Sequence, residues 1–143
     1  MLSRWFGPSI LVVVGVALAA STTSRVHLWS DGERLLWHDA VEKAPQKPRP
    51  MVNLGNQYML AGLDAVAEDT YQRATTLAEN PRRLSDERAY GYSLAQANIA
   101  QLEMKHGERD AGIARLRKVV KRYPVTSVQK LLIWYERQAA TTP

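Results

Sequence analysis

The hydrophobic pattern divides the chain into an apolar N-terminal run and a body with helical periodicity. Residues 5–24 carry no formal charge, and residues 10–20 are apolar throughout apart from Gly15. A helix of about 20 residues rises about 30 Å, the thickness of the hydrocarbon core of a bilayer. Because the run has no polar face, a helix in a soluble core is disfavoured. We therefore expect residues 1–24 to be a transmembrane anchor or a cleaved signal peptide.

The ends of this run fit both interpretations. Trp5 lies where interfacial aromatic residues are found beside a membrane span. Arg4 and the small residues Ala17 and Ala19 match the charged head and the cleavage site of a signal peptide. In both cases the short cationic N-terminus stays on the cytoplasmic side. Residues 25–143 are then expected outside the cytoplasm.

Helical periodicity continues from residue 25 to the end of the chain. No strand-like alternation of hydrophobic and polar residues persists in this part of the sequence. Capping residues, glycines and prolines mark where helices should begin and end. The expected helices span residues 30–43, 48–61, 64–78, 85–106, 108–122 and 126–138, followed by a loose tail at residues 139–143. The chain is thus predicted to be all-α.

Residues 48–81 carry a spacing of small and aromatic residues that suits a helical hairpin. Small residues are expected where the two helices cross, and tyrosines beside them. The positions are Leu54, Gly55, Tyr58, Gly62, Ala67, Tyr71 and Ala74, at offsets 7, 8, 11, 15, 20, 24 and 27 of a 34-residue unit. This spacing resembles the tetratricopeptide repeat (TPR). The resemblance implies antiparallel hairpins stacked as a short TPR solenoid.

The rest of the body fits the same repeat less closely. Residues 25–47 resemble a linker and the second helix of a preceding unit. Residues 82–124 resemble a degenerate second TPR unit with a lengthened first helix, and residues 125–143 a C-terminal capping helix and tail. The matching positions of the second unit are Ile99, Ala100, Gly107, Gly112, Leu116 and Pro124.

The join between the apolar run and the repeat has a narrower resemblance. It is similar to the junction between the last membrane helix and the TPR tail of polytopic glycosyltransferase-like membrane proteins. The catalytic part of that family lies in membrane spans that this chain lacks. The resemblance therefore implies a stand-alone version of the tail or a fragment of a larger protein. The residues that carry it include Arg25, Trp29, Asp31, Leu36, Trp37, Asp39, Pro45, Pro48 and Arg49.

The composition offers little for catalysis. The 143 residues include no cysteine, which excludes a thiolate nucleophile, a thiolate metal site and disulfides. His27, His38 and His106 lie far apart, without the spacing of three or four residues that a helical metal site needs. Phosphate-binding glycine loops and catalytic serine motifs are also absent from the sequence. We expect no enzyme, no metal, no cofactor and no small-molecule substrate.

The net charge of +5 is unevenly distributed. Residues 105–137 hold nine basic and three acidic residues, a net charge of +6. Within them Arg115, Lys118 and Arg122 form a basic stripe on one helix face. The stripe fits a solvated outer face, anionic lipid headgroups or an acidic face of a partner protein. Nucleic acid is not an expected partner outside the cytoplasm.

The first helices of the two units should line a protein-binding groove. Amides there can donate and accept hydrogen bonds to a peptide backbone, methionine gives adaptable apolar contact, and arginine or lysine can bind a carboxylate. For Asn53 and Asn98 the alternative is structural, as amides that bond a neighbouring helix. The candidate groove residues are Arg49, Asn53, Asn56, Met59, Asn98, Gln101 and Lys105.

Together these features predict a membrane-anchored TPR scaffold for protein binding. We expect a single-pass protein of the inner or cytoplasmic membrane, with lipid around residues 5–24 and the TPR domain in the periplasm or its equivalent. Its expected role is that of an accessory or assembly subunit of a larger membrane or envelope complex. Two alternatives remain: a non-catalytic tail that acts with a polytopic membrane glycosyltransferase, and a soluble periplasmic binding module released by signal cleavage.

Overall fold

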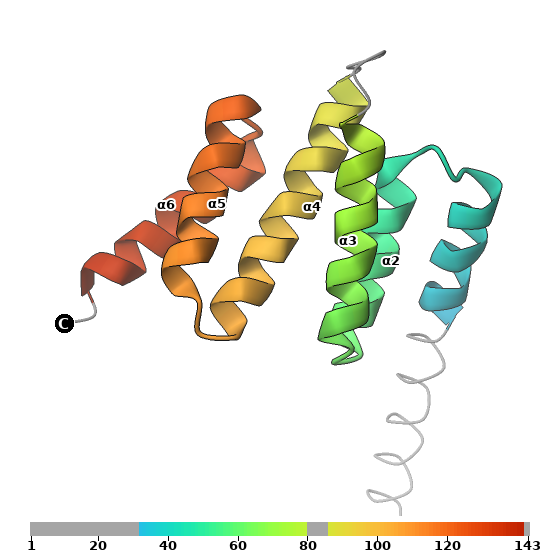
Figure 1. Cartoon of the computed structure of the whole chain (residues 1–143), viewed down its shortest axis with the longest axis horizontal. Helices are drawn as coiled ribbons and strands as arrows, with labels where there is room; N and C mark the ends of the chain where they lie inside the picture. Colours follow the sequence, from blue (N-terminus) through green and yellow to red (C-terminus); the bar gives the residue numbers. More distant parts are fainter. Residues whose placement is uncertain (1–31, 80–85, 142–143) are drawn as a thin grey trace, which may run out of the picture. The chain divides into compact units, whose positions relative to one another are not determined.

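The computed structural model describes residues 32–79 and 86–141, and every regular element in these ranges is a helix (Figure 1). The chain divides into two compact units, residues 1–35 and 36–143. The predictions made for residues 1–24, for Trp29 and for the segment around Pro81 lie outside the described residues. None of the described helices is long and apolar enough to cross a membrane.

The helix boundaries follow the breakers in the sequence. Residues 32–43 are helical, and five further helices follow: α2 (Pro48–Leu60), α3 (Asp64–Ala78), α4 (Asp86–Lys105), α5 (Arg109–Arg122) and α6 (Thr126–Thr141). Where both lie within the described residues, the observed helix ends agree with the expected ones to within a residue, except at the C-terminus. There the expectation of a loose tail from residue 139 was wrong, since α6 continues through Ala139 and Ala140. Alanine is the strongest helix former, and the next breaker is Pro143.

Two glycines close the turns between paired helices. Gly62 and Gly107 are the glycines with positive φ in the described chain, at +74° and +92°. Each ends its helix with the same pair of backbone hydrogen bonds. After α2, the N–H groups of Gly62 and Leu63 donate to the carbonyls of Met59 and Tyr58. After α4, Gly107 and Glu108 donate to the equivalent Met104 and Glu103 carbonyls. This arrangement is the Schellman motif, and it confirms both glycines as helix ends.

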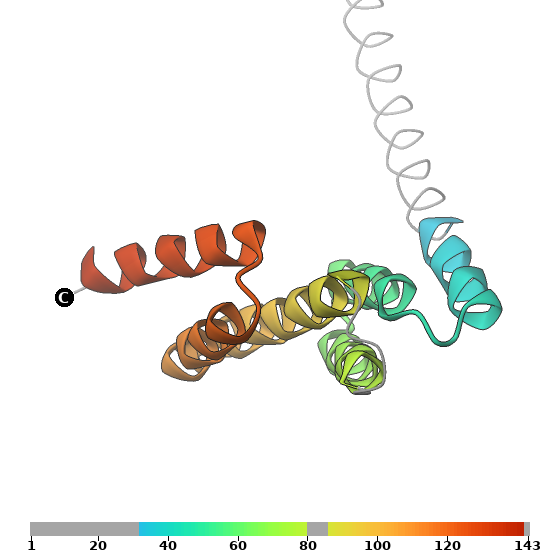
Figure 2. The same ribbon diagram turned by 90° about the horizontal axis from the view of Figure 1, so that it is seen from above.

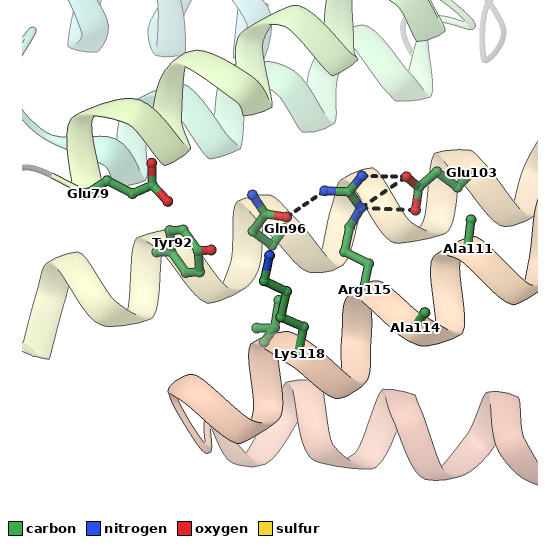
Figure 3. Close-up of a pocket in the computed structure, with 9 residues that line it drawn as sticks. Glu79, Tyr92, Gln96, Glu103, Ala111, Ala114, Arg115 and Lys118 are labelled. Carbon is green, nitrogen blue, oxygen red and sulfur yellow. Dashed lines mark hydrogen bonds and ion pairs between the residues drawn. The ribbon is translucent and has the colours of Figure 1, made fainter.

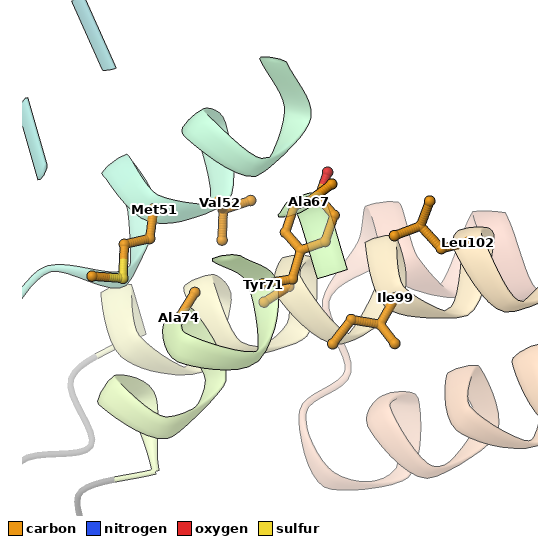
Figure 4. Packing of buried hydrophobic residues seen from close by; sticks show 8 residues of the cluster. Met51, Val52, Ala67, Tyr71, Ala74, Ile99 and Leu102 are labelled. Atoms are coloured by element: carbon orange, nitrogen blue, oxygen red, sulfur yellow. The ribbon is translucent and has the colours of Figure 1, made fainter. Parts of the chain in front are cut away.

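Helix α4 is the central element of the second unit. Helices α2 and α3 form one hairpin and α4 and α5 form another, while α4 also packs on α2 and α3 (Figures 1 and 2). Helix α6 packs on α5 and α4. Side chains of α4 accordingly belong to both hydrophobic clusters. The first contains Met51, Val52, Ala67, Tyr71, Ala74, Ala95, Ile99 and Leu102 (Figure 4), and the second Ala97, Ala100, Ile113, Leu116, Val119, Val128 and Leu132.

Close approach of the helices depends on glycines in each hairpin. A Cβ atom added at Gly55 in α2 would lie 2.4 Å from Cε1 of Tyr71 in α3. In the other hairpin, a Cβ atom at Gly112 in α5 would lie 2.6 Å from the carbonyl oxygen of Ala100 in α4. Both distances are shorter than a non-bonded carbon contact allows. In each hairpin a glycine therefore lies where the two helices meet.

Candidate functional site

The candidate groove residues come from two helices that pack against each other. Helix α2 carries Arg49, Asn53, Asn56 and Met59, and α4 carries Asn98, Gln101 and Lys105. Arg49 and Lys105 are exposed, and the other five side chains are half-buried. The seven side chains thus form two rows, one on α2 and one on α4, where these helices pack against each other.

Amides join the two rows directly. Asn98 Nδ2 donates to Asn56 Oδ1 at 2.7 Å, and Gln101 Nε2 donates to Asn98 Oδ1 at 3.2 Å. The hydroxyl of Tyr71 donates to the same Asn56 oxygen at 2.8 Å. Burial raises the pKa of Tyr71, so its hydroxyl stays a donor at physiological pH. Asn56 and Asn98 therefore hold α2, α3 and α4 together, which is the structural role considered for Asn98.

Asn53 has no such role in the described structure. Its side chain makes no hydrogen bond to any residue in 32–79 or 86–141, and it stays half-buried on α2. Arg49 lies four residues before it, on the same helix face. Arg49 is exposed and likewise has no ion-pair partner among the described residues. Among the polar candidate residues, these two are thus the ones whose side chains have no partner within the described chain.

Lys105 is engaged within the chain. Its Nζ donates to both carboxylate oxygens of Asp64 at 2.8 and 2.6 Å, and His106 Nε2 lies 3.1 Å from Asp64 Oδ2. Asp64 is the first residue of α3, where a carboxylate also favours the helix dipole. Hydrogen bonds from Lys105 and His106 lower the pKa of Asp64 below its usual value of 3.8. The cluster links the end of α4 to the start of α3.

We expect the Asp64 cluster to stabilise the fold at neutral pH and to lose its effect in acid. A carboxyl group whose pKa is lower in the folded state contributes above its unfolded pKa, and that contribution disappears as the pH falls through the folded pKa. Asp64→Asn should therefore destabilise the protein at pH 7, with a smaller difference from the wild type at about pH 3. Urea unfolding at both values measures this.

Asp69→Asn is the control for this prediction. It removes an exposed carboxylate from the same helix, and Asp69 has no ion pair within the described chain. The control should cost less stability at pH 7 than Asp64→Asn. An Asp64→Asn penalty that stays the same at both pH values would contradict the role given to the cluster.

The basic stripe on α5 is largely engaged within the protein. Arg115 Nε lies 3.0 and 2.9 Å from the two carboxylate oxygens of Glu103, and its Nη1 donates to Gln96 Oε1 at 2.8 Å. Hydrogen bonding to Glu103 raises the pKa of Arg115. Lys118 is exposed and makes no hydrogen bond or ion pair with any described residue. The stripe is therefore not a uniform cationic surface.

Arg122, the last residue of the stripe, rests on aromatic rings. Its guanidinium carbon lies 5.0 Å from the ring centre of Tyr92 and 5.3 Å from that of Tyr123. Arg122 Nη1 lies 3.4 Å from the Tyr92 hydroxyl and 3.5 Å from Glu79 Oε1. Both polar contacts are long, and the one to Glu79 is solvent-exposed, so they contribute little to stability.

A pocket of about 410 Å³ lies beside the stripe (Figure 3). Sequence patterns did not single out its α4 side chains, although Tyr92, Gln96 and Glu103 recur at helical spacing on one face. That spacing could have identified the α4 side of the pocket from the sequence. The α5 residues that face it could not be identified, because they follow only from the packing of the hairpin. The pocket is lined by Glu79, Tyr92, Gln96, Glu103, Ala111, Ala114, Arg115, Lys118 and Val119.

Comparisons with known proteins do not assign the chain to a family. The sequence matches no protein-family model, and comparisons with curated proteins and with solved structures give no match. In the described part of the chain no three histidine or acidic side chains gather in a way that would hold a metal ion. The described helices therefore define an all-α protein with paired helices in its second unit.

Proposed function

We propose that this chain is a membrane-anchored TPR module that binds another protein, as an accessory or assembly subunit of a membrane or envelope complex. Two features support the repeat: both hairpins end their first helix with the same glycine turn, and both have a glycine where their helices meet. Helix α6 would then be the capping helix, since it packs on both helices of the second hairpin.

The observation that carries the proposal is the hydrogen bond between Asn56 and Asn98. It fixes α2 against α4, so that groups from two hairpins form one surface. On that surface Asn53 offers an amide donor and acceptor, Arg49 a cation and Met59 an adaptable apolar contact. A peptide in an extended conformation presents backbone groups and side chains that such a surface can bind.

The membrane part of the proposal rests on the sequence. The charge-free run at residues 5–24 supports an anchor, and Arg4 before it supports a cytoplasmic N-terminus with the repeat on the other side. The role is non-catalytic in this proposal.

Arg49→Ala combined with Asn53→Ala is expected to weaken binding of the partner at least about tenfold, since a charge-assisted bond and an amide pair are lost. Neither residue bonds another described side chain, so the fold should be retained. Asn56→Ala is unsuitable, because it would also remove bonds to Tyr71 and Asn98. The measurement is capture of crosslinked partner from membranes that contain the full chain.

The matched control is Gln72→Ala combined with Arg73→Ala. Both residues are exposed on α3, away from the α2 and α4 positions of the groove. The control pair should capture the same partner as the wild type. Equal loss with both pairs, or equal capture with both, would rule out the α2–α4 surface as the binding face.

A further inference from the structure

The pocket between α4 and α5 is a second candidate site, and its lining shares no residue with the candidate groove residues on α2 and α4. We propose that it binds one carboxylate of an acidic peptide segment through Lys118. This inference does not depend on the proposed function. It follows from which charges in the pocket are already paired and which one is not.

At one end of the pocket, the guanidinium group of Arg115 is already hydrogen-bonded within the protein. Arg115 bonds both oxygens of Glu103 and the side-chain oxygen of Gln96, and the Glu103 side chain is only 16% exposed. A fork of two parallel bonds to a carboxylate is a strong and well-oriented ion pair. An incoming anion would have to break it to bind Arg115. The Arg115–Glu103 pair therefore has no net charge and is not the part of the pocket that binds an anion.

Lys118 supplies the charge that is not paired. It makes no hydrogen bond or ion pair with any residue that the structure describes, and Figure 3 shows its side chain rising from α5 toward Gln96 on α4. Its exposed ammonium group has three donors, which water can satisfy when the pocket is empty. A carboxylate in the pocket would accept from these donors in place of water.

A second donor lies in the same lining. The Tyr92 hydroxyl accepts a long bond from Arg122, at 3.4 Å, and its own hydrogen has no acceptor among the described residues. The Tyr92 side chain is buried, with 7% of its surface exposed, so its hydroxyl position is fixed by the core. Tyr92 and Lys118 thus present donors from opposite walls, α4 and α5.

The balance of charge selects a single carboxylate. Arg115 is held by Glu103, and Glu79 lies 3.5 Å from Arg122 outside the lining, so Lys118 is the lining cation that has no carboxylate partner among the described residues. A phosphate with nearly two negative charges would face both glutamates and be repelled more strongly. Ala111, Ala114 and Val119 form an apolar side on α5 that suits the methylene stem of a glutamate side chain.

A peptide is the favoured source of that carboxylate. Helix α5 carries six basic residues and one acidic residue, so an acidic segment that continued beyond the pocket would be attracted along the helix. The probe is the blocked tripeptide N-acetyl-Ala-Glu-Ala-amide, titrated into the full chain in a non-ionic detergent. Methyl resonances of Ala111 and Ala114 report binding in NMR spectra.

We expect the glutamate peptide to bind about tenfold more tightly than the same peptide with glutamine. Lys118→Met should abolish this preference, because it keeps the length of the side chain and removes the charge. Lys121→Met is the matched control, an exposed lysine of the same helix that should leave the preference intact. Ala114→Phe fills the pocket without changing any charge and should also abolish binding.

Three results would overturn the proposal. Equal binding of the glutamate and glutamine peptides would show that no carboxylate is recognised. Equal loss with Lys118→Met and Lys121→Met would show general attraction by α5 and no pocket. Tighter binding of a phosphoserine peptide would identify a phosphate site. The circular dichroism spectrum and thermal midpoint of each variant should match those of the wild type, which shows that a loss of binding is not caused by unfolding. Ala114→Phe tests the pocket independently of Lys118.

Discussion

Tyr71→Ala is expected to lower the free energy of unfolding by about 3–5 kcal/mol, the range for removing a large aromatic side chain from a core. Tyr71 is fully buried and lies in the first hydrophobic cluster with residues from α2, α3 and α4 (Figure 4). Its ring also lies against Gly55, where no side chain can fill the space that it would leave. Urea unfolding of the full chain, followed by circular dichroism, measures the loss.

Tyr71→Phe separates the ring from the hydroxyl. The ring and its packing remain, and Asn56 keeps its hydrogen bond from Asn98. This variant should therefore cost only about 0.5–1.5 kcal/mol, the usual net value of one hydrogen bond. If Tyr71→Ala cost no more than Tyr71→Phe, the ring would not be part of the core and the packing of the first hairpin would be wrong.

Gly112→Ala should destabilise the protein by about 1–3 kcal/mol, as extra atoms in a packed contact do. The added Cβ would lie 2.6 Å from the backbone carbonyl oxygen of Ala100, which belongs to α4 and cannot rotate away. Helices α4 and α5 would have to separate at their crossing. The sign of the change in the free energy of unfolding is informative, because alanine in place of glycine stabilises an unhindered helix by about 0.5–1 kcal/mol.

Gly32→Ala provides the matched control. Gly32 is helical and exposed, and a Cβ atom added there meets nothing within 4 Å. This change should leave stability unchanged or raise it slightly. A stabilising effect of Gly112→Ala, equal to that of the control, would show that α4 and α5 do not approach each other as described.

Local signals in the sequence were enough to predict the helices and both hairpin turns. A glycine that ends a helix with positive φ is a local requirement, so Gly62 and Gly107 could be identified without knowledge of the packing. Gly55 could be placed at a helix crossing because its spacing to Tyr71 resembles a known repeat. That resemblance itself stays a proposal.

Contacts between distant helices could not be predicted in this way. Gly91 was not singled out, yet an added Cβ atom there would lie 2.7 Å from Cγ of Pro48 at the start of α2. The reason is that this contact joins residues far apart in the sequence, and no helical period encodes it. The same limit applies to Arg115, whose partner Glu103 lies on the other helix of its hairpin.

For the candidate groove residues, the sequence predicted the helix on which each residue lies but not the partners of its side chain. Asn56 and Asn98 were correctly placed on α2 and α4, but only their mutual hydrogen bond shows that they stabilise the packing. Lys105 was expected as a ligand for a carboxylate, and its carboxylate in this structure is Asp64. Arg49 and Asn53 are the residues on which the binding proposal now depends.

Site-specific photocrosslinking from position 53 tests the central claim, protein binding at the α2–α4 surface, most directly. A photoreactive amino acid in place of Asn53 removes no hydrogen bond to a described residue and lies between Arg49 and Asn56 on the proposed binding face. The same amino acid at Arg73, exposed on α3, samples another face of the same hairpin. Both variants of the full chain are irradiated in native membranes.

Binding at the α2–α4 surface should give one dominant crosslinked protein from position 53, little or none of it from position 73, and loss of the position 53 product when Arg49→Ala is added. Crosslinking of the same protein with equal yield from both positions, or no protein product from position 53, would show that this surface is not where a partner protein binds.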